Sequence, residues 1–132
     1  MVRGTKETSK RFEALLAQMR EWPKSWAGCP EDLPVGESLL EPLDAFIRDM
    51  HAIGLADRTI RRHLDNAWAI GGELIRRFNL YPEERNRSGR ALLFDAICCD
   101  EAPLISGADE TEQSSADATA RKLHAFLKKT AG

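Results

Sequence analysis

The feature that most constrains this chain is an amphipathic pattern across residues 57–78. Apolar and small residues recur there every three or four positions, which is the spacing of one face of an α-helix. The stripe consists of Ile60, Leu64, Ala67, Trp68, Gly71, Leu74, Ile75 and Phe78. A helix with such a stripe needs partners along its whole length, so the rest of the chain is expected to pack around it.

Two adjacent glycines, Gly71 and Gly72, lie in the middle of this pattern. Each costs roughly 1 kcal/mol relative to alanine inside a helix. They indicate either a kink or the close approach of another helix. Because the apolar stripe stays in phase on both sides of the pair, we expect close approach.

A second amphipathic helix is predicted just before the first. Ser38 is a suitable N-cap, and Pro42 lies near the expected first turn, where proline is best tolerated. The apolar stripe of this helix, which ends near Ala52, consists of Leu39, Leu40, Leu43, Phe46, Ile47, Met50 and Ile53. Gly54 can take the positive φ of a helix C′ position, and Leu55 fits the apolar contact that follows it. The sequence therefore predicts helix, tight corner, helix.

The first 36 residues are predicted to form a helix over 6–22 and a loop over 23–36, packed on a helical core of 37–99. Pro23 should end the helix. An apolar stripe that ends at Trp22 favours packing on the core, but the basic residues Lys6, Lys10, Arg11 and Arg20 also suit an arm that touches phosphates or a partner. Trp22 and Trp26 either pin the loop to the domain or form an exposed binding patch.

The C-terminal third changes character along its length. Residues 79–89 suggest a turn or a one-turn helix, and 90–99 a short apolar helix. Residues 100–117 are acidic and contain no basic residue, which predicts a flexible linker. Ser115 is then expected to cap a basic helix that fills most of 118–132, with Ala120, Leu123, Phe126 and Leu127 on its apolar side. This helix either folds back on the domain or stands free as a partner-binding helix.

Together these patterns predict an all-α fold, a small orthogonal bundle of four to five helices around a long central one. The 132 residues suffice for one domain. No apolar run reaches the ~18 residues that cross a bilayer, and the N-terminus lacks the apolar region of a secretory signal, so a cytoplasmic protein without membrane partners is expected. The three cysteines do not form a disulfide framework, and Cys98 is expected to be a small buried residue. No Cys or His pair has a zinc-site spacing, so neither a metal nor another cofactor is expected.

Residues 39–78 resemble the N-terminal, SAM-like core-binding domain of tyrosine recombinases and phage integrases. In that family an apolar helix ends at a Gly-Leu pair, and a Thr-Ile-x-x-x-Leu run begins the next helix. Here these are Gly54-Leu55, Thr59-Ile60 and Leu64. The resemblance implies a small helical bundle that clamps DNA from one side, with basic helix faces on phosphates.

The chain departs from the family in two places. It has Ala56-Asp57 where the family often has Ser-Pro, although Asp57 still suits a helix start. It also has no counterpart of the catalytic domain, because its sole tyrosine, Tyr81, lacks the Arg/His/Arg setting of the recombinase nucleophile. The resemblance therefore implies a stand-alone binding module without recombinase activity.

The candidate nucleic-acid-binding residues are the basic and hydroxyl side chains of the long helix, extended by Arg85, Arg87 and Arg90. They are Arg58, Thr59, Arg61, Arg62, Arg76 and Arg77. Guanidinium groups near a helix N-terminus suit phosphate oxygens. The alternative is a solvated face whose charge is offset by Asp57, Asp65, Glu73, Glu83 and Glu84.

No sequence motif of an enzyme is present: there is no G-x-S-x-G, P-loop or H-E-x-x-H. We therefore expect a non-catalytic module that binds double-stranded DNA. The alternative is a protein-interaction domain that presents Trp22, Trp26 or the C-terminal helix to a partner. A weaker third interpretation is an accessory subunit that is ordered only as an oligomer.

Overall fold

The computed structural model describes residues 2–97 and 99–130, with the side chains of 10–84, 86–97 and 99–130. This part of the chain is all-α and contains no strand, as predicted. Its elements are α1 (Val2–Met19), α2 (Trp22–Trp26), α3 (Asp32–Ala52), α4 (Asp57–Leu80), the 3-10 helix η1 (Pro82–Asn86), α5 (Gly89–Ala96) and α6 (Glu110–Lys129). In the described residues, no helix combines the length and apolarity that a membrane crossing requires.

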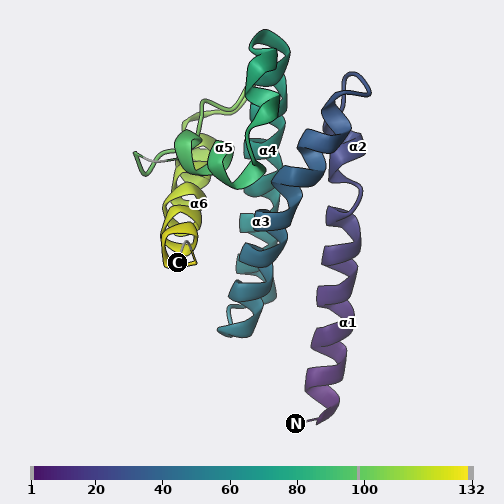
Figure 1. The fold of residues 1–132 in the computed structure, drawn as a ribbon. Coiled ribbons are helices and arrows are strands. Elements are labelled where there is room, and N and C mark those ends of the chain that lie inside the picture. Colours follow the sequence, from purple (N-terminus) through teal and green to yellow (C-terminus); the bar gives the residue numbers. More distant parts are fainter. Residues whose placement is uncertain (1, 98, 131–132) are drawn as a thin grey trace.

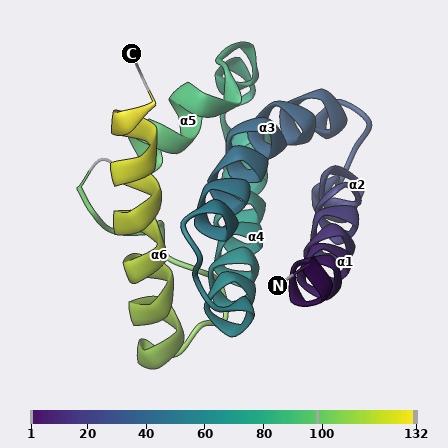
Figure 2. The ribbon, with the colours of Figure 1, turned by 90° about the horizontal axis from the view of Figure 1, so that it is seen from below.

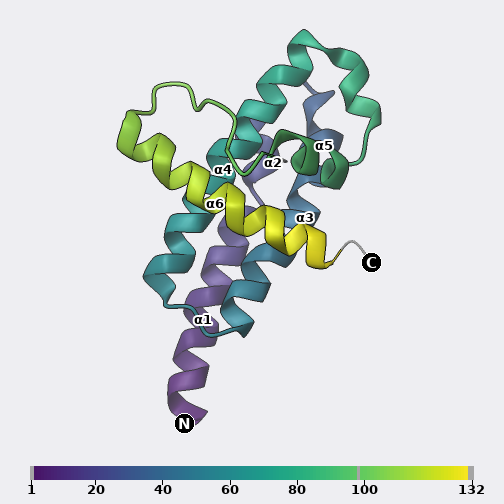
Figure 3. The same cartoon turned by 90° about the vertical axis from the view of Figure 1, so that its left-hand side faces the viewer.

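Helices α3 and α4 lie side by side at the centre of the bundle (Figure 1). Seen from below, α1 and α2 lie on one side of this pair and α6 lies on the other (Figure 2). Helix α6 crosses α4 and α3 obliquely, and α5 packs near the start of α3 (Figure 3). The sides of α4 that remain open are therefore bounded by α1 and α2 on one flank and by α6 on the other.

The corner between α3 and α4 forms as the sequence predicts. Gly54 has a φ of +87°, a conformation that favours glycine. Its N–H donates to the carbonyl of His51 at 3.1 Å, and the Leu55 N–H donates to the carbonyl of Met50 at 3.1 Å. These two bonds are the Schellman pattern that ends a helix and turns the chain.

The apolar stripe of α4 is buried except at one residue. The prediction is wrong for Trp68, whose side chain is 45% exposed. Trp68 lies at the edge of the stripe, and the adjoining space is filled by Trp26 from α2, which contacts Gly71. Ile70 and His63 complete the buried face instead.

The two glycines of α4 allow a close approach, as expected, but the approaching group is a side chain. A Cβ at Gly71 would lie under 3.0 Å from Cζ2 of Trp26. The Trp26 Nε1 donates to the carbonyl of Trp68 at 2.9 Å, which fixes the indole over the helix. Trp22 and Trp26 are both buried, so they pin α2 to the domain and the exposed-patch alternative is wrong.

The loop expected over 23–36 is largely helical. The first helix ends at Met19, and Pro23 lies in the first turn of α2, which begins at Trp22. Helix α3 begins at Asp32, not at Ser38. Both Pro23 and Pro34 lie in first turns, where the missing N–H has no intrahelical partner to lose. The Asp32 carboxylate accepts the N–H of Gly28 at 2.8 Å and so orders the short connection before α3.

Because α3 starts early, Pro42 lies inside the helix and not in its first turn. Proline has no N–H, so the Ser38 carbonyl loses its usual partner four residues on, and α3 bends (Figure 1). The Ser38 hydroxyl accepts the N–H of Gly89 at 2.7 Å. A Cβ at Gly89 would lie under 3.0 Å from the Ser38 carbonyl oxygen. The start of α5 therefore docks where the hydrogen-bond ladder of α3 is interrupted.

Helix α6 begins earlier than predicted, because its acidic residues form the helix start. Asp109, not Ser115, is the N-cap, and it forms a reciprocal capping box with Glu112. Acidic residues in a first turn are also favoured by the helix dipole. The helix folds back on the core through Ala116, Thr119, Ala120, Leu123, Phe126 and Leu127, so the free-standing alternative is wrong. The expectation for Cys98 lies outside the described residues.

The Trp26 contact predicts opposite effects for two neighbouring substitutions. Gly71→Ala places a methyl group against a buried ring that cannot move away cheaply, so we expect a loss of about 1–3 kcal/mol in unfolding free energy. Gly72→Ala meets Trp26 only at 3.4 Å, an ordinary contact, so the gain in helix propensity should raise stability by up to about 1 kcal/mol. Urea denaturation followed by circular dichroism measures both. Equal effects of the two substitutions would contradict the close contact between the Trp26 ring and Gly71.

Candidate nucleic-acid interface

The arginines at the start of α4 lie on two flanks of the helix. Arg58 and Arg61 line a cleft between α4 and α1, with a volume of about 540 Å³. Arg62 lines a shallower depression between α4 and α6. Thr59 is half-buried between these positions. The structure therefore keeps the first four predicted site residues together at one end of α4.

The α1–α4 cleft is basic. Arg11 of α1 joins Arg58 and Arg61 in its lining, and the single carboxylate among the lining residues is that of Asp57. The Arg11 Nη1 lies 3.8 Å from Asp57 Oδ2, while Arg58 makes no ion pair within the described part of the chain. Ala56 provides no side-chain cap, so the first N–H groups of α4 have no cap acceptor from that residue. The cleft thus offers donors and positive charge to an anion.

The sequence alone did not assign Arg11 to the same site as Arg58. It offers Arg11 only as part of a basic arm that touches phosphates or a partner, the alternative to a helix packed on the core. That α1 packs next to the start of α4 is a tertiary fact, which no local spacing in the sequence encodes.

A second basic pair lies on the other flank of α4. Burial, with the positive charges of Arg62 and Lys122, lowers the pKa of His63 to about 4. Arg62 comes from α4 and Lys122 from α6, so the two helices together place positive charge beside the buried imidazole. Arg62 makes no ion pair with any residue whose side chain is described.

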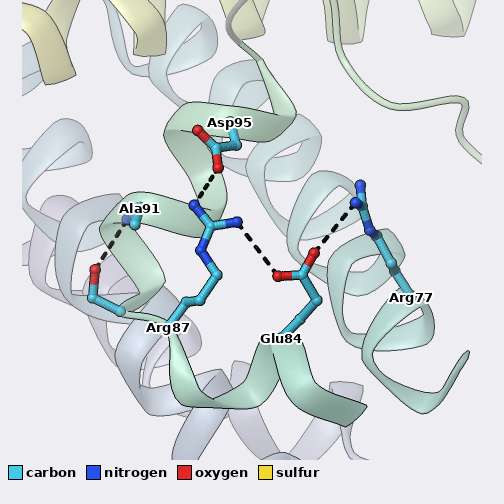
Figure 4. A network of polar contacts seen from close by, with 6 residues as sticks. Arg77, Glu84, Arg87, Ala91 and Asp95 are labelled. Carbon is cyan, nitrogen blue, oxygen red and sulfur yellow. Dashed lines mark hydrogen bonds and ion pairs between the residues drawn. The ribbon is translucent and has the colours of Figure 1, made fainter. Parts of the chain in front are cut away.

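Arg76 and Arg77 are in a different environment. Arg76 Nη1 lies 3.9 Å from Glu73, and Arg77 Nη2 lies 3.4 Å from Glu84. Glu84 also contacts Arg87, which in turn pairs with Asp95 (Figure 4). The structure does not bring Arg76 and Arg77 together with Arg58.

The arginines that follow α4 have structural partners too. Arg87 belongs to the network around Glu84. Arg90 donates to the carbonyl of Leu127 at 2.6 Å and to the Thr130 hydroxyl at 2.8 Å, so it caps the end of α6. The side chain of Arg85 lies outside those described.

His63 is the most deeply buried ionisable group near this end of α4, at 2% exposure. Its Nδ1 lies 2.7 Å from the Thr119 hydroxyl oxygen, which also accepts a hydrogen bond from Asn66 at 2.8 Å. The Asn66 amide donates to the Ser115 carbonyl as well, at 3.1 Å. This polar cluster joins α4 to α6 inside the bundle. His63 and Thr119 are buried, whereas Asn66 and Ser115 line an open hollow beside α4.

Comparisons with known proteins add no relative to this picture. A scan against protein-family models, a search of curated proteins and a search of solved structures each found no match. The resemblance to recombinase core-binding domains therefore stays a prediction. Among the described residues, no group of three or more His, Cys, Asp or Glu side chains could hold a metal ion.

His63 predicts a pH dependence of stability. Its folded pKa of about 4 lies below the ordinary histidine pKa of 6.5, so the unfolded chain takes up the proton first. The His63 contribution is fully present above about pH 6.5 and is lost as the pH falls to about 4. The expected loss is about 3 kcal/mol in unfolding free energy.

Urea denaturation at pH 7, 5.5 and 4.5 measures this effect. Because carboxylates also titrate in acid, the His63→Gln variant serves as the reference at each pH. The stability advantage of the unsubstituted chain over this variant should shrink as the pH falls. A constant difference would show that His63 is not the titrating group.

Proposed function

We propose that this chain is a non-catalytic DNA-binding module that contacts backbone phosphates through the start of α4. The observation that carries the proposal is the α1–α4 cleft, where Arg11, Arg58 and Arg61 meet around one carboxylate. Guanidinium groups bind phosphate through paired N–H donors, and the N-terminus of a helix adds favourable dipole and backbone donors.

The state of the arginines supports a division of roles along α4. Arg58 and Arg62 make no ion pair within the described residues, so a phosphate need not displace a carboxylate from them, whereas Arg61 lies 3.8 Å from Asp65. Arg76 and Arg77 already contact Glu73 and Glu84, so their charge is partly neutralised. We therefore assign the phosphate contacts to the first turns of α4, with the Thr59 hydroxyl as a further donor.

The family resemblance supports the same proposal from another direction. The helix–corner–helix at Gly54 is the part of the chain that resembles recombinase core-binding domains, and it positions the same turns of α4. On this proposal the chain is a relative of such a domain. Its binding would be governed by phosphate charge and would show little preference for base sequence.

Binding to random-sequence duplex DNA, measured by fluorescence anisotropy across a salt series, tests the proposal. Affinity should fall steeply with salt. The triple variant Arg58→Ala/Arg61→Ala/Arg62→Ala should bind more weakly, and its log–log salt slope should drop by up to about 2.7, or about 0.9 per lost phosphate contact.

The double variant Arg76→Ala/Arg77→Ala is the matched control. It removes two ion-paired arginines from the other end of the same helix, whereas in the triple variant only Arg61 is ion-paired. Its affinity should change little. No binding at low salt would overturn the proposal. An equal loss per arginine in the two variants would overturn the assignment to the first turns.

The alternative function, a protein-interaction domain, loses two of its expected surfaces. Trp22 and Trp26 are buried, and the C-terminal helix is packed on the core. A third tryptophan, Trp68, is exposed, and it lines a groove along α4.

A further inference from the structure

A groove follows the open side of α4 between α2 and the segment 105–108. It consists of two hollows, of about 770 and 370 Å³, which share Ser25, Trp68, Ala69, Ile105 and Ser106 in their linings. The lining from α4 extends from Arg61 in the first hollow to Asn79 in the second. By helix rise this is about 27 Å. We call this feature the α4 groove.

Hydrogen bonds fix one wall of the α4 groove. The indole of Trp26 donates to the Trp68 carbonyl at 2.9 Å, and the indole of Trp68 donates to the Ser25 hydroxyl at 3.0 Å. The Ser25 hydroxyl in turn donates to the carbonyl of Trp22 at 2.8 Å. Helix α2 and the rim tryptophan are therefore held in place by one another.

Hydrogen bonds fix the opposite wall as well. Glu73 accepts the N–H of Ser106 at 2.8 Å, and Gln113 accepts the N–H of Ile105 at 2.9 Å. The segment that carries these residues is thus tied to both α4 and α6. A groove whose walls are already ordered loses little conformational entropy when a ligand enters it.

The surface of the α4 groove combines an exposed aromatic ring with small residues. Trp68 is 45% exposed, and Ala69 and Gly72 leave room beside it on the same helix. The Leu104 side chain, next to the groove residue Ile105, is 84% exposed. Apolar side chains of a partner could occupy this space.

The negative charge of the first hollow indicates which kind of partner segment would bind there. Its lining contains the carboxylates of Glu21, Asp65 and Glu112 but only one basic side chain, Arg61. Asp65 and Arg61 lie 3.8 Å apart, so the remaining two carboxylates leave a negative excess. This excess repels phosphate and favours a cation, and a cation next to Trp68 can also interact with the indole face.

We propose that the α4 groove binds a basic amphipathic segment of a partner protein. An Arg or Lys side chain of that segment lies beside Trp68 among the carboxylates of Glu21, Asp65 and Glu112. Its apolar side chains cover Ala69 and Gly72. A helical segment of about 18 residues would match the length of the groove. The groove shares only Gln18 and Arg61 with the lining of the α1–α4 cleft, so either proposal can fail without the other.

A designed peptide tests this inference. The probe is an amidated helical peptide of about 18 residues, composed of Leu, Ala and Arg, with its arginines along one edge of the apolar face. Two matched peptides carry Gln or Glu at the arginine positions. Titration of the ¹⁵N-labelled protein at low salt should give the largest shifts at groove residues. The Arg peptide should bind at least tenfold more tightly than the Gln peptide, and the Glu peptide should not bind.

Protein variants separate the groove from general surface charge. Glu21→Gln/Asp65→Asn should weaken binding of the Arg peptide at least tenfold. Glu83→Gln/Glu101→Gln, which removes two exposed carboxylates outside the groove, should change it less than twofold. Thermal melts confirm that both variants fold. The inference is overturned if the Arg peptide does not bind, if all three peptides bind alike, if shifts map elsewhere, or if both variants lose affinity equally.

Discussion

The contact between the Trp26 indole and the bare backbone of Gly71 is the constraint on which the rest of the molecule depends. It brings α2 directly onto α4, and the connected helices α1 and α3 follow it. The ring fills the space that a longer side chain at position 71 would take, and it leaves Trp68 at the rim. Both candidate surfaces, the basic α1–α4 cleft and the acidic α4 groove, border elements that this contact positions.

The sequence predicts those features of the fold that depend on local periodicity. The stripes of α3 and α4, apart from the exposed Ile53 and Trp68, and the Gly54 corner could be found because their signals lie within a few residues of one another. The start of α3 could not, because the Ser38 hydroxyl resembles an N-cap yet binds the N–H of Gly89, far away in the chain. The start of α6 had a local signal, the Asp109–Glu112 capping box, but the acidic composition around it suggested a linker.

The candidate site shows the same division between local and tertiary information. The sequence places Arg58, Arg61 and Arg62 near one another on α4, and the structure keeps them at one end of the helix. It cannot tell which arginines are neutralised, since the partner of Arg77 belongs to η1. Nor can it place Arg11 in the cleft. The difference in charge between the α1–α4 cleft and the α4 groove therefore depends on how the helices pack, and the number of charged residues in the sequence does not reveal it.

The interruption in α3 has a consequence for how this chain can vary. Pro42 removes the donor that would satisfy the Ser38 carbonyl, and Gly89 lies against that carbonyl without a Cβ. A residue with an N–H at position 42 could restore the helical bond and straighten α3, moving the surface on which α5 rests. Substitutions at positions 42 and 89 should therefore be epistatic: the effect of one depends on the residue at the other, although the two are distant in sequence.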